Sequence, residues 1–201
     1  MAEVYERPAQ ALTVELEIKN SRFICHAAPT RGAAAAQAFI DDIRGRYPDA
    51  SHNCWCYVAG SPGDYNLWNS SDDGEPRGTA GKPMLNVLQH SGLGEVTVVV
   101  TRYFGGIKLG AGGLVRAYSL AVQNCLSELT TEAVIPTRNL RLLAPHRQTG
   151  SVEQLLRQLG LEVSDRHWGE ELELSLELTE DQHKALEQRL APFPDVRLVA
   201  D

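Results

Sequence analysis

The sequence has 201 residues, 43% of them hydrophobic, and a formal net charge of −7 at neutral pH. This length suits one good hydrophobic core or two small ones, because domains commonly have about 100–150 residues. The negative charge argues against a protein that is basic as a whole, as most nucleic-acid-binding proteins are, so a phosphate-binding surface would have to be local.

The predicted elements begin with a β-hairpin and a helix. Leu12, Val14, Leu16 and Ile18 alternate with polar residues, which is the period-two pattern of a half-buried strand. A turn at residues 19–21 leads into a second strand at residues 22–27. Thr30 is the expected cap of a helix that Pro48 closes, and the buried stripe of this helix consists of Ala36, Phe39, Ile40, Ile43 and Tyr47.

The middle of the chain alternates strands, loops and helices. Residues 51–59 predict a strand, and the polar segment 60–81 that follows is long enough to be functional or disordered. A short helix is expected at residues 82–91, because Pro83 suits a first turn and Gly92 follows its end. Residues 95–103 predict a buried strand. A glycine-rich turn then leads into a longer helix with the apolar face Leu114, Tyr118, Ala121, Val122, Cys125 and Leu129.

The pattern changes after Pro136, where we place a domain boundary between residues 1–136 and 137–201. The apolar spacing there predicts the order βαββαβ, which is the ferredoxin-like arrangement of two helices on a four-stranded antiparallel sheet. Thr179 and Gln182 form a capping-box pattern at the start of the last helix. The chain as a whole is therefore expected to be α+β.

The cysteines and the start of the chain bear on its location. No apolar run approaches the roughly 20 residues of a membrane-spanning helix, and residues 1–6 lack the pattern of a secretory signal, so we expect a cytoplasmic protein. The four cysteines are then interpreted as reduced thiols.

One cluster, His52, Cys54 and Cys56, consists of residue types that commonly bind zinc. Strand positions two apart are about 6.6 Å from each other, however, whereas sulfurs on one zinc lie within roughly 4 Å, so we predict no metal there and interpret His52 as lying at the mouth of the adjoining loop.

A second cluster consists of the carboxylates of Asp72, Asp73 and Glu75. These residue types suit a magnesium site or an acid/base pair, and equally a solvated turn. The cluster runs directly into a glycine-containing loop and a predicted helix start. Both interpretations therefore stay open from the residues alone.

Two glycine-rich loops each lead into a predicted helix N-terminus. Free backbone N–H groups and the helix dipole make such termini sites for anions, although the glycines could equally serve only to permit tight turns. Neither loop matches a nucleotide fingerprint, so no cofactor is predicted. No Asp or Glu occurs between Val96 and Ser127, which makes this region locally basic. Tyr103 and Phe104 add candidate stacking platforms for bases. The candidate anion- or RNA-binding residues are Arg77, Thr79, Lys82, Arg102, Tyr103, Lys108, Gly110, Gly112, Gly113 and Arg116.

Several blocks of the sequence together resemble the signature of the YigZ/IMPACT family. They are residues 52–57 (HNCWCY), 71–76 (SDDGEP), 78–83 (GTAGKP), 101–110 (TRYFGGIKLG) and 113–118 (GLVRAY). The resemblance implies an N-terminal domain with a ribosomal-protein and GHMP-kinase-like α+β fold. It also implies a ferredoxin-like C-terminal module similar to a late domain of elongation factor G, and a link to translation.

Three functions are compatible with these observations. The first is a translation-associated regulatory protein that binds RNA or the ribosome through the local basic, glycine-rich loop surface. The second is a protein-interaction regulator of a stress or translation factor. The third is an enzyme acting on a phosphorylated small molecule, although no nucleophilic catalytic set can be assembled from the sequence. We expect a monomer without enzymatic activity, whose partner is RNA, the ribosome or a translation-related protein.

Overall fold

The computed structural model describes residues 4–200, which form two compact units, Val4–Val134 and residues 135–200. The first three residues, which belong to the segment inspected for a secretory signal, lie outside the described part. Each unit has a hydrophobic core of its own. Both units combine helices with antiparallel sheets, so the prediction of an α+β chain is confirmed.

A five-stranded sheet forms the centre of the first unit, in the order β2-β3-β6-β4-β5, with each neighbouring pair antiparallel. The predicted hairpin is present, because β2 and β3 pair from Leu12 opposite Ala27 to Ile18 opposite Ser21. The strands of this sheet are β2 (Leu12–Ile18), β3 (Ser21–Pro29), β4 (His52–Val58), β5 (Trp68–Ser71) and β6 (Val96–Tyr103).

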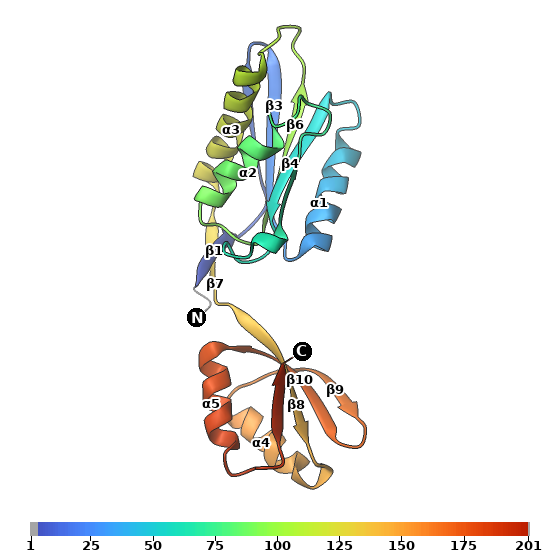
Figure 1. Cartoon of the computed structure of the whole chain (residues 1–201), viewed down its shortest axis with the longest axis vertical. Helices are drawn as coiled ribbons and strands as arrows, with labels where there is room; N and C mark the ends of the chain where they lie inside the picture. The colour runs from blue at the N-terminus through green and yellow to red at the C-terminus, as the bar shows by residue number, and fades with distance from the viewer. Residues whose placement is uncertain (1–3, 201) are drawn as a thin grey trace. The chain divides into compact units, whose positions relative to one another are not determined.

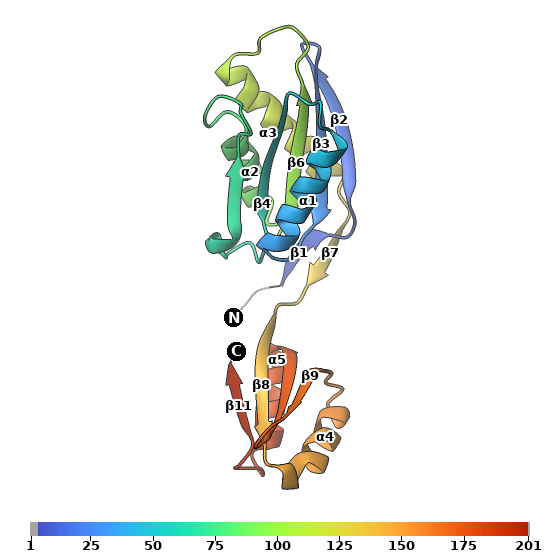
Figure 2. The ribbon, with the colours of Figure 1, turned by 90° about the vertical axis from the view of Figure 1, so that its right-hand side faces the viewer.

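Helices cover both faces of this sheet (Figure 1). Helices α2 (Gly81–His90) and α3 (Ala111–Glu128) lie on one face, over a core that includes Phe23, Cys54 and Val98. Helix α1 (Ala33–Arg46) lies on the other face, where Ile40 and Ile43 pack against β4 and β6 (Figure 2). Because both faces are covered, β6 is buried over almost its whole length.

Three features of the first unit differ from the sequence prediction. Helix α1 begins after Gly32 rather than at a Thr30 cap, because the Thr30 hydroxyl is buried against the Thr97 hydroxyl at 2.6 Å. The segment 60–81 is not a loop throughout, since it contains a 3-10 turn (Tyr65–Leu67) and the edge strand β5. A separate two-stranded sheet joins β1 (Tyr5–Pro8) to β7 (Thr131–Val134), and neither strand was predicted.

The second unit has the predicted βαββαβ order. Its sheet order, β11-β8-β10-β9, is antiparallel throughout and matches the ferredoxin-like arrangement. The predicted capping box is present, since the Thr179 and Gln182 side chains each accept from the other's backbone N–H. Its elements are β8 (Thr137–Ala144), α4 (Thr149–Gln158), β9 (Val163–Trp168), β10 (Leu172–Thr179), α5 (Glu180–Leu190) and β11 (Arg197–Ala200).

Across residues 4–200, no helix is both long enough and apolar enough to span a membrane. The four cysteines are buried free thiols.

Candidate functional site

The sequence motifs gather at one end of the five-stranded sheet, which we call the loop end. Here the β2–β3 turn and the loop between β6 and α3 lie close together (Figure 1). A Cβ atom at Gly105 would lie 2.0 Å from the carbonyl carbon of Asn20, so only glycine allows this approach. The loop between β5 and α2 also reaches this end of the sheet, because Asp73 of this loop contacts His52 and Asn53, the first two residues of β4.

Asp72 closes the N-terminus of α2. Its carboxylate accepts hydrogen bonds from the backbone N–H groups of Gly78 at 2.7 Å, Ala80 at 3.0 Å and Gly81 at 2.8 Å. Partial burial disfavours the charged carboxylate, but these bonds and the nearby Arg77 prevail and lower the pKa of Asp72 below its ordinary value. Helix α2 therefore already binds an anion at its N-terminus, which corrects the prediction that this terminus is open to an external phosphate.

Asp73 and Glu75 are also committed to contacts within the protein. Asp73 pairs with Arg44 at 2.6 Å and accepts from the backbone N–H of Asn53 at 2.7 Å. Glu75 is buried and accepts from the Arg102 guanidinium at 2.6 Å and from the Tyr118 hydroxyl at 2.8 Å. The three carboxylates of residues 72–75 thus point to different partners.

These contacts correct the magnesium hypothesis. A magnesium ion needs oxygen ligands that converge on one point. Within residues 4–200, no group of three or more His, Cys, Asp or Glu side chains is arranged to hold a metal ion. The cluster of Asp72, Asp73 and Glu75 organises the loop that it belongs to.

Arg102 is a buried residue and not a surface cation. Its guanidinium lies between the rings of Phe23 and Phe104, with its central carbon 5.5 and 5.6 Å from their centroids. Only 7% of its side chain is exposed, and Glu75 neutralises it. This position corrects the prediction that Arg102 contacts phosphate.

His52 adjoins the same buried pair. Its Nδ1 lies 2.8 Å from the carbonyl oxygen of Asp73, and its Nε2 lies 3.8 Å from the Glu75 carboxylate. Its neighbours Cys54 and Cys56 are fully buried in the core, as predicted. Burial raises the pKa of both thiols well above the ordinary range, so they remain protonated and unreactive.

Two further candidates for anion or base contact are less accessible than expected. The Thr79 hydroxyl is buried and donates to the carbonyl oxygen of Pro76 at 2.6 Å. Tyr103 is half-buried and donates to Asp49 at 2.9 Å. The Arg22 guanidinium lies 5.5 Å from its ring centroid, so Arg22 occupies one face of the ring. The neighbouring Phe104 is 49% exposed and is the more accessible aromatic side chain.

The N-terminus of α3 differs from that of α2. Helix α3 has 18 residues and begins after Gly110, whose φ of 74° favours glycine. The first helical hydrogen bond joins the Leu114 N–H to the Gly110 carbonyl at 2.9 Å, so the three preceding N–H groups point out of the helix end. Among the described residues, no side chain caps this terminus. Its free N–H groups and the positive end of the helix dipole favour a negative charge at this position.

Two exposed cations flank this open terminus. Lys108 lies just before α3, and the Arg116 guanidinium lies 3.8 Å from where a Gly112 Cβ would be. Neither forms an ion pair with any residue that the structure describes. We define the α3 N-terminal surface as Lys108, Gly110, Ala111, Gly112, Gly113 and Arg116. Arg77 and Lys82, which precede or begin α2, are also exposed.

Sequence reasoning missed one exposed apolar side chain in this loop. Ile107 is 46% exposed beside Lys108, close in sequence to Phe104. An apolar residue that precedes a glycine-rich turn after a buried strand is the signal that could have identified it.

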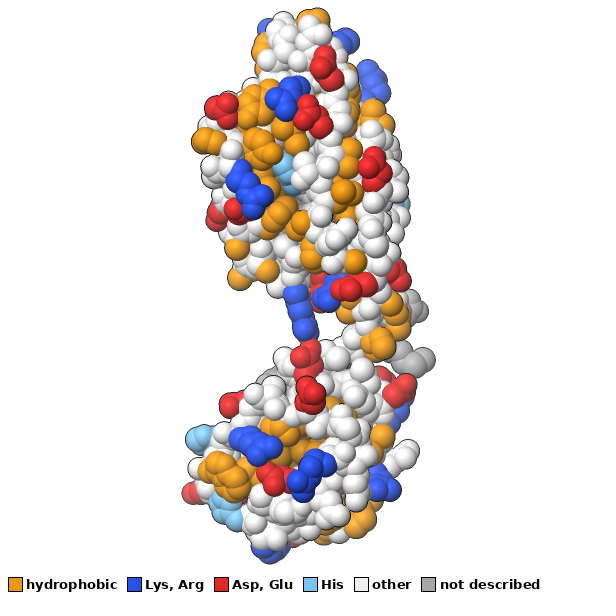
Figure 3. Space-filling model, turned by 180° about the vertical axis from the view of Figure 1, so that it is seen from behind, with side chains coloured by type: hydrophobic (Ala, Val, Ile, Leu, Met, Phe, Trp, Pro, Cys, Tyr) orange, Lys and Arg blue, Asp and Glu red, His pale blue; other side chains and the backbone are white. Residues whose placement is uncertain are grey.

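The face seen in Figure 3 carries Lys and Arg side chains that are scattered among acidic ones and form no broad basic patch.

The comparisons with known proteins agree with the motifs. The Impact N-terminal domain model matches residues 19–126. An Escherichia coli protein, IMPACT family member YigZ, is 50% identical over 75% of this chain and 74% of its own length. An IMPACT family member from Haemophilus influenzae is 42% identical over 99% of this chain and 96% of its own. A crystal structure of a hypothetical protein, 41% identical, matches 100% of this chain and 98% of its own with a TM-score of 0.85. This chain belongs to the IMPACT family.

Proposed function

We propose that this IMPACT-family protein is a translation-associated regulatory protein that binds RNA phosphates, on the ribosome or on free RNA, with its α3 N-terminal surface. The link to translation comes from the family resemblance, and the binding chemistry comes from the loop end. This role predicts a cytoplasmic protein that needs no cofactor.

The observation that carries this proposal is the contrast between two neighbouring helix N-termini. The α2 terminus is occupied by the Asp72 carboxylate, whereas the α3 terminus ends in glycines with no cap from a described side chain. A phosphate oxygen can approach the α3 terminus closely, because Gly112 has no Cβ and Arg116 lies beside it. Helix dipole, free N–H groups and two cations then act on the same anion.

The surroundings of this surface favour nucleic acid over a small phosphorylated metabolite. Phe104 and Ile107 are exposed in the loop that leads into it, and an exposed aromatic ring offers a stacking platform for a base. The enzyme hypothesis depended on carboxylates that could hold magnesium against a phosphate. Since Asp72, Asp73 and Glu75 bind backbone N–H groups, Arg44, Arg102 and Tyr118 instead, no observation favours that alternative.

Co-sedimentation with ribosomes tests the proposal in its biological setting. The protein should sediment with ribosomes from a lysate at low salt and leave them at high salt, because exposed phosphate contacts are screened. Lys108→Ala/Arg116→Ala should move most of the protein to the supernatant at low salt. If both proteins stay in the supernatant at every salt concentration, the ribosome is not the partner; if both sediment equally, the α3 N-terminal surface is not the binding site.

A further inference from the structure

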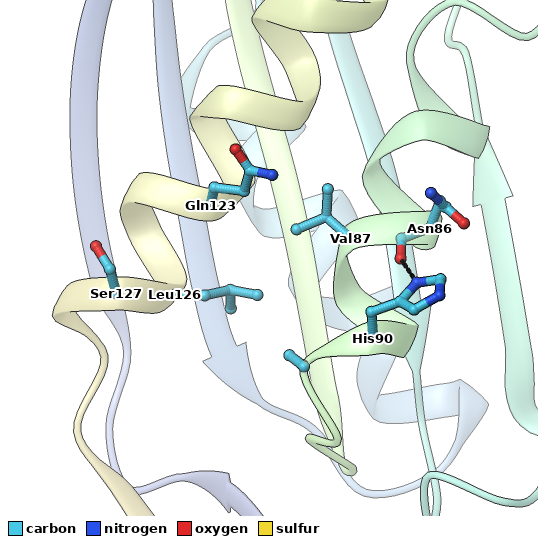
Figure 4. A pocket seen from close by; sticks show the side chains of 7 residues that line it. Asn86, Val87, His90, Gln123, Leu126 and Ser127 are labelled. Atoms are coloured by element: carbon cyan, nitrogen blue, oxygen red, sulfur yellow. Dashed lines mark hydrogen bonds between the residues drawn. The ribbon is translucent and has the colours of Figure 1, made fainter.

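A groove between α2 and α3 is lined by none of the residues of the α3 N-terminal surface, although its α3 wall leads up to Arg116 of that surface. It is open to solvent and has a volume of about 610 Å³ near the C-terminal ends of the two helices. Its floor is apolar, because Val87 of α2 and Leu126 of α3 point toward one another from facing helices (Figure 4). The groove is large enough for one or two apolar side chains of a partner.

The rim of the groove is polar and carries no Asp, Glu, Lys or Arg side chain. Asn86 and His90 form one wall, and Gln123 and Ser127 form the other. The His90 ring bonds the Asn86 carbonyl oxygen at 2.6 Å, which fixes its orientation. Rim side chains of this kind donate and accept hydrogen bonds, as the polar rim around an apolar interface centre does.

The charge pattern along the two helices indicates the charge of the partner. Lys82, Asn86 and His90 are exposed at i, i+4 and i+8 on α2, and Arg116, Leu120, Gln123 and Ser127 share one stripe of α3. Each wall therefore leads from the groove toward a cation nearer the N-terminus of its helix, Lys82 on α2 and Arg116 on α3. No Asp or Glu occurs in residues 76–94 or 96–127, although the whole chain carries a charge of −7.

We propose that this groove docks an acidic amphipathic segment of a partner protein. An apolar side chain of that segment fills the groove over Val87 and Leu126. Its carboxylates face Lys82, about 7.5 Å along α2 from Val87, and Arg116, about 15 Å along α3 from Leu126. Leu120, which is 42% exposed on the same stripe, extends the apolar contact toward these cations. The residues that line the groove carry no carboxylate that would repel such a segment, and the exposed Glu128 lies beyond them at the end of α3.

RNA is a poorer occupant of this groove. Its phosphates need cations or free N–H groups, and the groove is lined by no Lys or Arg side chain and has an apolar floor. The two binding sites are therefore distinguished by chemistry, with phosphate at the α3 N-terminal surface and an apolar, acidic peptide between the helices.

The test uses the full chain and a displayed library of random 16-residue peptides as the probe. Enriched peptides should combine apolar residues with net negative charge. They should bind Gln123→Glu about threefold to tenfold more weakly than the parent and Gln123→Lys more tightly, because the new charge faces the bound segment. Gln37→Glu, on α1 across the sheet, makes the same change on another helix and should leave the affinity unchanged.

Three outcomes of the peptide experiment would overturn the inference. They are no enrichment of any peptide, enrichment of basic or uncharged peptides, and acidic peptides whose affinity is the same for Gln123→Glu and the parent. RNA binding distinguishes this inference from the proposed function. Gln123→Glu should leave oligouridylate binding largely intact, whereas Lys108→Ala/Arg116→Ala should weaken it. Equal loss of peptide and RNA binding in Gln123→Glu would assign the groove to the RNA surface instead.

Discussion

The Arg102 guanidinium donates to the Glu75 carboxylate at 2.6 Å, with 7% of the Arg102 side chain and 3% of the Glu75 side chain exposed. The Tyr118 hydroxyl donates to the same carboxylate oxygen at 2.8 Å. Burial raises the pKa of Tyr118 far above its ordinary value, so this hydroxyl stays a proton donor at every physiological pH. Arg102, Glu75 and Tyr118 together join β6, the loop before α2 and helix α3.

Removing one member of this pair should be costly. Arg102→Met leaves the Glu75 carboxylate buried without its cation, and such a change costs about 3–5 kcal/mol of unfolding free energy. The double variant Arg102→Met/Glu75→Gln removes both charges and should recover part of that loss. Urea denaturation of the parent and these variants measures both quantities. A loss below about 1 kcal/mol in Arg102→Met would mean that the pair behaves like an exposed one.

The Asp72 carboxylate should stabilise α2 as a cap. Asp72→Ala is expected to cost about 1–2 kcal/mol, because it removes the acceptor of three backbone N–H groups. Asp72→Asn should cost less, since its amide oxygen still accepts. Equal stability of the alanine variant and the parent in urea would contradict the capping role.

His26 should make stability depend on pH. It is 4% exposed, its ring packs on Tyr47, and its Nδ1 lies 3.0 Å from the Thr13 hydroxyl. Burial, with a smaller effect of Arg46, lowers its pKa from 6.5 to about 4. The unfolded chain therefore binds a proton that the folded chain does not in this window, and stability should fall by up to about 3 kcal/mol as the pH falls from 6.5 to 4.

The control for this pH effect is His26→Gln, which keeps a hydrogen-bonding side chain but cannot titrate. Its stability should be lower at neutral pH and flatter than that of the parent between pH 6.5 and 4. Thermal melts at closely spaced pH values compare the two proteins. Parallel curves for the parent and His26→Gln would show that His26 is not the titrating group.

The second unit should fold alone. A fragment of residues 137–201 includes every strand of the second sheet and the apolar cluster under it. It should therefore show a cooperative thermal transition. A fragment of residues 145–201 lacks β8, which pairs with both β10 and β11, and should not fold. A featureless melt of the longer fragment would contradict the predicted boundary.

Much of the fold was predictable because apolar spacing repeats along the longer elements. The alternation from Leu12 to Ile18 and from Leu172 to Leu178 each produced a correct strand. The strands that escaped prediction have four residues each, too few to show a period. Strand β1 and its partner β7 also lie at opposite ends of the sequence of the first unit, with Tyr5 opposite Val134. No local pattern predicts a partner so distant in sequence.

The site was harder to predict because charge type does not determine exposure. Arg102 was interpreted as a surface cation, but on β6 it lies four and two positions after the buried residues Val98 and Val100. Positions two apart face the same side of a sheet, so this burial was available from the sequence. The capping role of Asp72 was not, because it depends on how the loop folds back to Gly78 and Gly81.

The most direct test of the account is the salt dependence of RNA binding. Fluorescence anisotropy with labelled oligouridylate should give micromolar affinity at low salt, with a slope of about 2 in a log–log plot, since each of about three contacts contributes about 0.7. Lys108→Ala/Arg116→Ala should weaken binding and lower the slope by about 1.4, while Arg157→Ala/Lys184→Ala, which removes two exposed cations from the second unit, should leave both nearly unchanged. Salt-independent binding by the parent, or the same slope in the Lys108/Arg116 variant, would contradict the assignment of the α3 N-terminal surface.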